Sequence, residues 1–258
     1  MTKLISIHSF RGGTGKSNTT ANLAVMIAKT GRRVAIIDTD IQSPGVHVLF
    51  ALDPSRVTYT LNDYLWSKCK IEEAAYDVTD SVVGNADESG RTRLFLVPSS
   101  IDTGAIAKIL REGYDVGMLN DGLHELADRL KLDILLIDTH PGVNEETLLS
   151  IAISDLLLLI MRPDNQDFQG TAVTAELARR LDVKKMLLMV NKVPPSMDRE
   201  ALRRRVEDLY GVEVAGILPL NEEIVNVASG AIFTNRYPQH PFTRCLVQVV
   251  DRVLECLA

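Results

Sequence analysis

The sequence has little of what marks a secreted, membrane-spanning or nucleic-acid-binding protein. Its 258 residues include only three cysteines, Cys69, Cys245 and Cys256, which form neither a CxxC pair nor a metal-ligand cluster. No window approaches the roughly 20 apolar residues that a membrane-spanning helix needs, and the apolar run at the N-terminus is too short for a signal peptide. The net charge of −6 argues against a dedicated nucleic-acid binder but leaves room for a local basic patch. These absences predict a soluble protein of the reducing cytoplasm.

Short apolar runs alternate with longer segments of helical period, and no break in composition marks a domain boundary. This alternation is typical of a parallel sheet covered by helices. We therefore predict one α/β domain, residues 1–258, with a doubly wound, mostly parallel sheet and helices on both faces. The polar stretch 85–93 is expected to form a flexible surface loop. The predicted strands are 4–8, 33–38, 93–97, 134–138, 156–161, 185–191 and 213–217, and the predicted helices are 16–30, 115–130, 145–153, 168–181, 199–210 and 242–257.

The residues with the clearest chemistry follow the first predicted strand, in the run Gly12-Gly13-Thr14-Gly15-Lys16-Ser17. A phosphate chain needs several backbone N–H donors at close range, hence glycines without a Cβ, and a helix N-terminus behind them. Lys16 is then expected to contact the β- and γ-phosphates, and the Ser17 hydroxyl to bind Mg²⁺. The Gly-Lys-Ser sequence in this setting favours a P-loop NTPase over an ordinary glycine turn.

The loop departs from the standard G-x4-G-K-[ST] pattern. The first glycine of that pattern would fall at Phe10, whereas here glycines occupy positions 12 and 13 after the basic residue Arg11. The run 11–17 resembles the deviant Walker A motif of the ParA/MinD family of P-loop ATPases, K-G-G-x-x-G-K-[ST], and Asn22-Leu23-Ala24 matches the same family. The resemblance covers most of the chain, from residue 4 to about residue 224.

The resemblance implies an ATPase that binds ATP and Mg²⁺ and is a homodimer while ATP is bound. The signature lysine of the family reaches across the dimer interface to the partner's nucleotide, and Arg11 stands at that position. An arginine keeps the charge and can contact phosphate oxygens with two donors, so the catalytic role is expected to survive. Asn18 stands where a threonine is common, and it is expected to donate to the α-phosphate.

Carboxylates end two of the predicted strands and resemble the two switch regions of the family. After the second strand, Asp38 is implied to lie on the metal side and Asp40 to position the attacking water, the two tasks that in-line displacement requires. A solvated turn at a strand end is the alternative. After the fourth strand, Asp138 resembles the Walker B residue that contacts Mg²⁺ through water. His140 replaces a proline of the family, and it is either a sensor of the γ-phosphate or the partner, or only a polar loop side chain.

Two further residues resemble the purine-binding part of the family site. Asn191 ends the sixth predicted strand and corresponds to the asparagine whose amide pairs with the N6 and N7 edge of adenine. No aspartate that would select guanine follows it, because Val193 and two prolines come next. Pro219 matches the loop that packs on the purine. ATP is therefore favoured over GTP.

Relatives of this kind position a cargo by binding a surface only as the ATP-bound dimer, so an unknown protein partner that stimulates hydrolysis or is the cargo is implied. Segment 242–257 has one apolar stripe and a polar face of mixed charge, which predicts a core-packing helix and not a membrane-targeting one. Arg203, Arg204 and Arg205 could contact DNA phosphates without sequence preference. Glu207 lies on the same predicted helix and favours a solvated mixed-charge face.

Two other classes of function stay open from the sequence. One is a metabolic P-loop enzyme similar to ATP-dependent synthetases and amidotransferases, which would turn over ATP only with a small-molecule acceptor. The other is an interaction protein that binds ATP with little turnover. A positioning ATPase, whose cargo is a chromosome, a plasmid, a division complex or another protein assembly, fits the motifs best.

Overall fold

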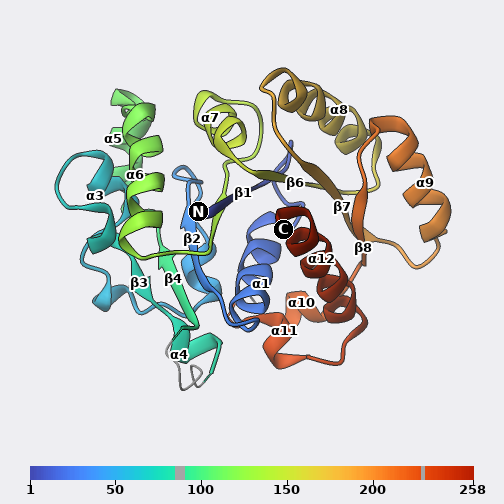
Figure 1. Cartoon of the computed structure of the whole chain (residues 1–258), viewed down its shortest axis with the longest axis horizontal. Helices are drawn as coiled ribbons and strands as arrows, with labels where there is room; N and C mark the ends of the chain where they lie inside the picture. The colour runs from blue at the N-terminus through green and yellow to red at the C-terminus, as the bar shows by residue number, and fades with distance from the viewer. Residues whose placement is uncertain (85–90, 228–229) are drawn as a thin grey trace.

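The computed structural model describes residues 1–84, 91–227 and 230–258, so residues 85–90 of the expected surface loop lie outside the described residues. Eight strands form one sheet in the order β3-β4-β2-β5-β1-β6-β7-β8, and all neighbours are parallel except β3 and β4 (Figure 1). The predicted doubly wound, mostly parallel sheet is confirmed. The strands are β1 Lys3–His8, β2 Arg33–Asp38, β3 Tyr76–Asp77, β4 Arg93–Val97, β5 Ile134–Asp138, β6 Leu156–Met161, β7 Met186–Val193 and β8 Val214–Pro219.

Helices cover both faces of the sheet (Figure 1). One face carries α1 and α12, which also contact each other. The opposite face carries α3 and α6 over one half and α8 and α9 over the other. The helices are α1 Lys16–Ala28, α2 Val46–Leu49, α3 Leu61–Leu65, α4 Thr79–Val82, α5 Thr103–Glu112, α6 Val116–Arg129, α7 Glu145–Ile153, α8 Asn165–Arg180, α9 Arg199–Tyr210, α10 Glu223–Asn226, α11 Phe233–Arg236 and α12 Pro241–Leu257, with 3-10 turns at Pro54–Arg56 and Ile71–Ala74.

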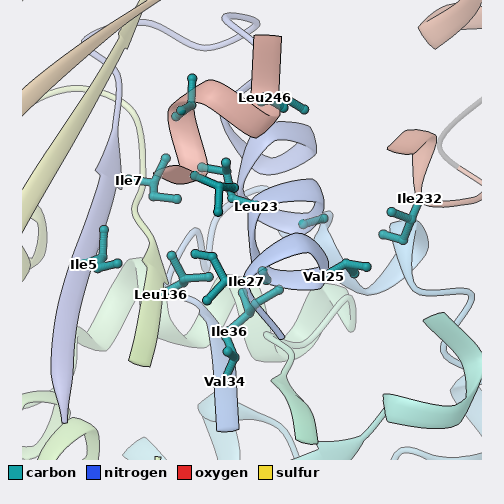
Figure 2. Packing of buried hydrophobic residues seen from close by; sticks show 14 of the residues in the cluster. Ile5, Ile7, Leu23, Val25, Ile27, Val34, Ile36, Leu136, Ile232 and Leu246 are labelled. Carbon is teal, nitrogen blue, oxygen red and sulfur yellow. The ribbon is translucent and has the colours of Figure 1, made fainter. Parts of the chain in front are cut away.

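The core under α1 shows why the strands read as continuous apolar runs. Strand side chains alternate between the two faces. Both faces are buried, so most strand positions are apolar, and the exceptions include Ser6 within β1 and His8 at its end. Figure 2 shows Ile5 and Ile7 of β1 and Ile36 of β2 facing Leu23 and Ile27 of α1, and all five are at most 1% exposed. This packing fixes α1, and with it the loop that precedes α1, against the middle of the sheet.

The last helix, α12, packs into the core as its apolar stripe predicts. Leu246, Val249, Val250 and Val253 are at most 4% exposed, and the helix contacts β8 and α1. Among the described residues, no helix is both long enough and apolar enough to cross a membrane.

Several short elements were not predicted, and neither were helix α5 and strand β3; the short ones are α2, α3, α4, α10, α11 and the two 3-10 turns. Helix α5 fills the stretch between β4 and α6, where Ile109 is its single buried residue. Its amphipathic pattern is short and begins at the polar Asp102, which caps the helix by accepting a hydrogen bond from the Ala105 N–H at 2.8 Å. Strand β3 has only two residues and pairs antiparallel at the sheet edge, too short for its alternation to be visible in the sequence.

The strand order determines where the functional residues meet. β1 lies between β5 and β6 in the sheet. From β1 the chain passes to β2, on the side where β5 lies, whereas from β5 it crosses to β6 on the other side of β1. The carboxyl ends of β1, β2 and β5 therefore share one edge beside this switch point, where ligands bind in sheets of this kind.

Candidate nucleotide-binding site

The loop between β1 and α1 has a backbone that only glycine accommodates well. Gly13 and Gly15 adopt positive φ angles of 76° and 91°. A Cβ added to Gly15 would lie 2.5 Å from the Nδ2 atom of Asn191, so a side chain there would displace that amide. The loop ends on the first turn of α1, whose free N–H groups attract anions.

The loop encloses a cavity of about 250 Å³. Backbone N–H groups, a lysine and a helix N-terminus are the donors that a phosphate chain requires, and the glycines leave room for a close approach. The residues present therefore fit the phosphates of a nucleotide. The cavity is lined by Ser9, residues 12–18, Asp40, Ser43 and Pro141.

Asp138, at the end of β5, is the centre of the polar cluster below this cavity. It is fully buried and lies 3.0 Å from the Lys16 ammonium. The Ser17 hydroxyl donates to its Oδ2 at 2.6 Å, and the Thr20 hydroxyl donates to its Oδ1 at 2.7 Å. The structure thus brings three of the predicted site residues together. A serine hydroxyl beside a carboxylate supplies the oxygen ligands that Mg²⁺ prefers, with phosphate oxygens and water completing the shell.

Asp38, at the end of β2, is bound mainly to the backbone of the loop that follows it. Its carboxylate accepts hydrogen bonds from the N–H groups of Asp40, Gly45 and Val46 at 3.1, 3.1 and 3.3 Å. Burial, with the neighbouring charge of Asp138, raises its pKa to about 7. Its metal-side role stays a prediction, and its visible role is to hold this loop folded against the site.

Asp40 lies at the rim of the cavity. Among the described residues, only its Oδ1 accepts hydrogen bonds. The hydroxyl and the N–H of Ser43 donate to its Oδ1 at 2.9 and 3.2 Å, and Nδ1 of His140 lies 2.7 Å from the same oxygen. Burial works to raise the pKa of Asp40, but the hydrogen bond from His140 and the charge of Lys16 outweigh it, so this pKa lies below its usual value. The carboxylate is thus held ionised beside the phosphate cavity.

His8 is a residue of this site that sequence analysis missed. Its ring is fully buried, and Nδ1 lies 2.8 Å from the Thr139 hydroxyl, which itself donates to the Ile7 carbonyl. The Nε2 atom is buried without a hydrogen-bond partner among the described residues. Burial, then the charges of Lys16 and His140, lower the pKa of His8 to about 3. A polar residue at the end of an apolar strand, directly before a glycine loop, is the signal that could have found it.

A second, smaller cavity of about 140 Å³ adjoins the phosphate cavity and shares Gly15 and Asn18 with it. It is lined by both residues predicted to hold the purine, Asn191 and Pro219. The Asn191 amide donates to the Thr14 carbonyl at 2.8 Å, so it also ties β7 to the phosphate loop. Two adjoining cavities, one polar at a helix N-terminus and one more apolar, match the two ends of a nucleotide.

The CobQ/CobB/MinD/ParA nucleotide-binding domain family matches residues 5–231 of the chain. The chain belongs to this family. An uncharacterised ATP-binding protein of Methanocaldococcus jannaschii is 26% identical over 251 residues, which cover 97% of this chain and 87% of that protein. The structure resembles the cell division ATPase MinD of Pyrococcus furiosus with a TM-score of 0.81 and 23% identity over 100% of both chains. It also resembles MinD of Pyrococcus horikoshii complexed with Mg-ADP, with a TM-score of 0.79 and 22% identity over 98% of this chain and 96% of that one.

Membership of the CobQ/CobB/MinD/ParA family confirms the resemblance drawn from the sequence motifs, and the two solved structures confirm the fold. Within the residues that the structure describes, no group of three or more His, Cys, Asp and Glu side chains is arranged to hold a metal. Of the predicted Mg²⁺ ligands, Ser17 and Asp138 are hydrogen-bonded to each other, and Asp38 is paired with Asp138 in the strand register. This donor set suits an ion that arrives with phosphate oxygens and water.

Arg11, the variant of the family's basic residue, contacts the start of α8. Its guanidinium lies 3.6 Å from a carboxylate oxygen of Asp164 and 3.5 Å from one of Asp167. Arg162 also pairs with Asp167, at 3.2 Å. The Arg11 side chain is still 38% exposed, so it is held at the rim of the site without being enclosed.

Phe10, which occupies the position of the missing first glycine, packs against α8. A Cβ added to Gly170 of that helix would lie 2.0 Å from Cδ1 of Phe10. The aromatic ring therefore fits against a helix position that lacks a side chain, and it anchors the start of the phosphate loop to α8.

Arg203, Arg204 and Arg205 of α9 line neither of the two nucleotide cavities. Arg203 pairs with Glu207 at 3.5 Å, and the Arg205 guanidinium lies over the ring of Phe168, 4.6 Å from its centroid. Arg204 is exposed. Two of the three charges thus have contacts within the chain, and nonspecific DNA binding by this cluster stays a prediction.

Proposed function

We propose that the protein is a Mg²⁺-dependent ATPase that acts as a dimerisation switch and positions a cellular cargo in the manner of MinD and ParA proteins. The observation that carries the proposal is the cluster of Lys16, Ser17 and Asp138 beneath a glycine-lined cavity, with Asp40 at its rim. Such a cluster offers a lysine for the phosphates, oxygen ligands for Mg²⁺ and a carboxylate for the attacking water.

In nucleotide binding, the N–H groups of residues 12–18 hold the phosphates and the Lys16 ammonium neutralises their charge. The ion pair with Asp138 directs the Lys16 side chain into the site. Ser17 and Asp138 hold Mg²⁺, while Asn191 and Pro219 contact the adenine. Bound ATP and Mg²⁺ supply the phosphoanhydride bond and the positive charge that stabilises the departing phosphate.

In hydrolysis, Asp40 orients the attacking water and Asp38 holds the loop that carries Asp40. Only Oδ1 of Asp40 accepts hydrogen bonds from the described residues, so Oδ2 is left for the water. A single carboxylate oxygen and one lysine make a modest catalytic set, which fits the slow turnover of a switch.

In dimerisation, Arg11 leaves its contacts on α8 and reaches the nucleotide of a second copy of the chain. Its exposure at the rim of the site supports this reach. ATP then biases the equilibrium between monomer and dimer, because each nucleotide is contacted from both subunits only in the dimer. A protein partner that recognises the dimer or stimulates hydrolysis completes the switch.

The test measures ATP binding and phosphate release for the wild type, Lys16→Ala and Asp40→Ala. Both variants should lose turnover by about a hundredfold or more, while Asp40→Ala keeps ATP affinity and Lys16→Ala loses it. Lys184→Ala removes an exposed lysine far along the chain and serves as the control. Turnover that appears only with an added small-molecule acceptor would point to a metabolic enzyme, and binding without turnover in the wild type would point to an interaction protein.

A further inference from the structure

His140 lies opposite Asp40 because of the register of two neighbouring strands. Asp38 of β2 pairs with Asp138 of β5 in the parallel ladder. Asp40 and His140 each follow two residues later, so both leave the sheet at the same level on adjacent strands. The proline that His140 replaces has no side-chain donor and could not bind the carboxylate from this position.

The contact between the two side chains has a defined direction. Asp40 is ionised, so its Oδ1 is an acceptor, and the Nδ1 atom of His140 at 2.7 Å must carry the proton. Both Ser43 donors address the same Oδ1. All three donors therefore hold one carboxylate oxygen and fix the direction in which the other oxygen, Oδ2, points.

The backbone around His140 is held without help from the imidazole. The Thr147 hydroxyl of α7 donates to the His140 carbonyl at 3.2 Å, and the Gly142 N–H donates to the Ser9 carbonyl at 3.2 Å. The imidazole is only partly exposed, at 23%, and within the described part of the chain its one hydrogen bond is with Asp40. Its contact with Asp40 is thus separable from the folding of the loop.

We propose that His140 is a positioning residue for hydrolysis, which orients Asp40 toward the attacking water through its Nδ1–H donor. The inference rests on the proposed ATPase function and deepens it. It gives a specific role to a side chain that the family motif does not supply. The donated hydrogen bond restrains the carboxylate in the geometry for in-line attack, so its loss lowers the rate of the chemical step and not the affinity for ATP.

Asparagine and glutamine variants of His140 test whether Nδ1 is the nitrogen that orients Asp40. The amide nitrogen of asparagine lies as many bonds from Cα as Nδ1 of histidine, whereas that of glutamine lies one carbon further. His140→Gln and His140→Ala should lower kcat about ten- to a hundredfold, with KM for Mg-ATP within about threefold of the wild type. His140→Asn should keep kcat within about threefold. His124→Gln, on the exposed face of α6, is the matched control and should match the wild type.

Three outcomes of the kinetics would overturn the inference: wild-type kcat in His140→Gln and His140→Ala, a loss confined to KM, or a His140→Asn variant as slow as His140→Ala. A wild type that binds ATP without hydrolysing it would instead remove the proposed function, and the inference with it. The asparagine–glutamine comparison remains informative if the alanine variant fails to fold.

A second measurement needs no turnover. In protein labelled with ¹⁵N-histidine, the imidazole shifts of His140 should show the proton on Nδ1 in the wild type. In Asp40→Ala the proton should move to Nε2, the preferred site in free histidine. A wild-type His140 that carries its proton on Nε2 alone would overturn the inference.

Discussion

Three titratable side chains, His8, Asp38 and Asp138, lie fully buried at the ends of neighbouring strands. Burial disfavours the charged form of each. It lowers the pKa of His8 to about 3 and, together with the charge of Asp138, raises that of Asp38 to about 7. Asp138 has the Lys16 ammonium at 3.0 Å as its counter-charge. At this scale the Lys16–Asp138 ion pair lies close to a histidine that is neutral in the folded protein.

The neutral His8 predicts a pH dependence of stability. Between pH 6.5 and about 3 the unfolded chain binds a proton at this residue and the folded chain does not. The free energy of unfolding should therefore fall as pH falls below 6.5, by up to about 1.4 kcal/mol per pH unit. His8→Asn keeps a donor to Thr139 but does not titrate, so between pH 7.5 and 5.5 it should lose about 1.4 kcal/mol less than the wild type in urea unfolding.

His124→Asn, at an exposed position of α6, is the control for this measurement. Its loss of stability between the two pH values should equal that of the wild type. An equal loss in His8→Asn would show that His8 is already protonated in the folded protein, contrary to its burial.

At the scale of elements, the start of α8 is tied to the phosphate loop. Asp164 caps this helix by accepting from the N–H groups of Gln166 and Asp167, and its other contacts are with Arg11 and Arg162. Since Asp167 is nearly buried and also binds the Arg162 backbone, the cap is a rigid anchor. In the proposed dimer, where Arg11 reaches the nucleotide of a second subunit, this anchor would compete for Arg11.

Asp164→Asn should therefore favour the ATP-bound dimer. Asparagine is an equally good helix cap, so the change removes charge beside Arg11 and Arg162 without removing the cap. A partly exposed ion pair of this kind contributes about 0.2–1 kcal/mol, which predicts a dimer dissociation constant up to about fivefold lower in analytical ultracentrifugation with ATP. This gain in dimer affinity should become smaller at high salt, because salt screens the charges.

Asp182→Asn removes the same charge from an exposed loop position and is the control for Asp164→Asn. At low salt, the dimer dissociation constant of Asp164→Asn should be clearly lower than that of Asp182→Asn. Equal dissociation constants in both, or weaker dimerisation in Asp164→Asn, would show that the contacts of Arg11 with α8 do not compete with the dimer.

At the scale of the whole molecule, the nucleotide cavities and Arg11 lie beyond the carboxyl ends of the central strands. Helices α1 and α12 cover one face of the sheet with their apolar sides, and α6, α8 and α9 cover the other (Figure 1). In the proposed dimer, a second copy of the chain would complete the nucleotide site at this edge of the sheet.

A variant that binds ATP but cannot hydrolyse it should accumulate as the dimer. Asp40→Ala with Mg-ATP is expected to show twice the 28.5 kDa mass of the chain in light scattering, while the wild type returns to monomer as ATP is consumed. The double variant Lys16→Ala/Asp40→Ala should remain monomeric because it lacks the nucleotide. An Asp40→Ala protein that stays monomeric with bound ATP would contradict the switch.

The sequence by itself determined the fold class and the phosphate loop. Buried strands read as continuous apolar runs because both of their faces are covered, and a loop with positive φ at Gly13 and Gly15 must place glycine there. The apolar runs and the glycine positions are both local features of the sequence, so they can be recognised without knowing which elements pack together. Helix α5 escaped prediction because one buried side chain leaves too weak a pattern.

Only the tertiary structure decided which polar groups act together. Asp40 meets His140 across 100 positions of sequence, and Arg11 meets Asp167 across 156. These contacts depend on the order β2-β5-β1-β6 and on the Asp38–Asp138 register. Hydrophobic patterning fixes which residues form strands, but strand order follows from how the helices pack over the sheet. The pairing of each carboxylate is therefore a property of the packed molecule.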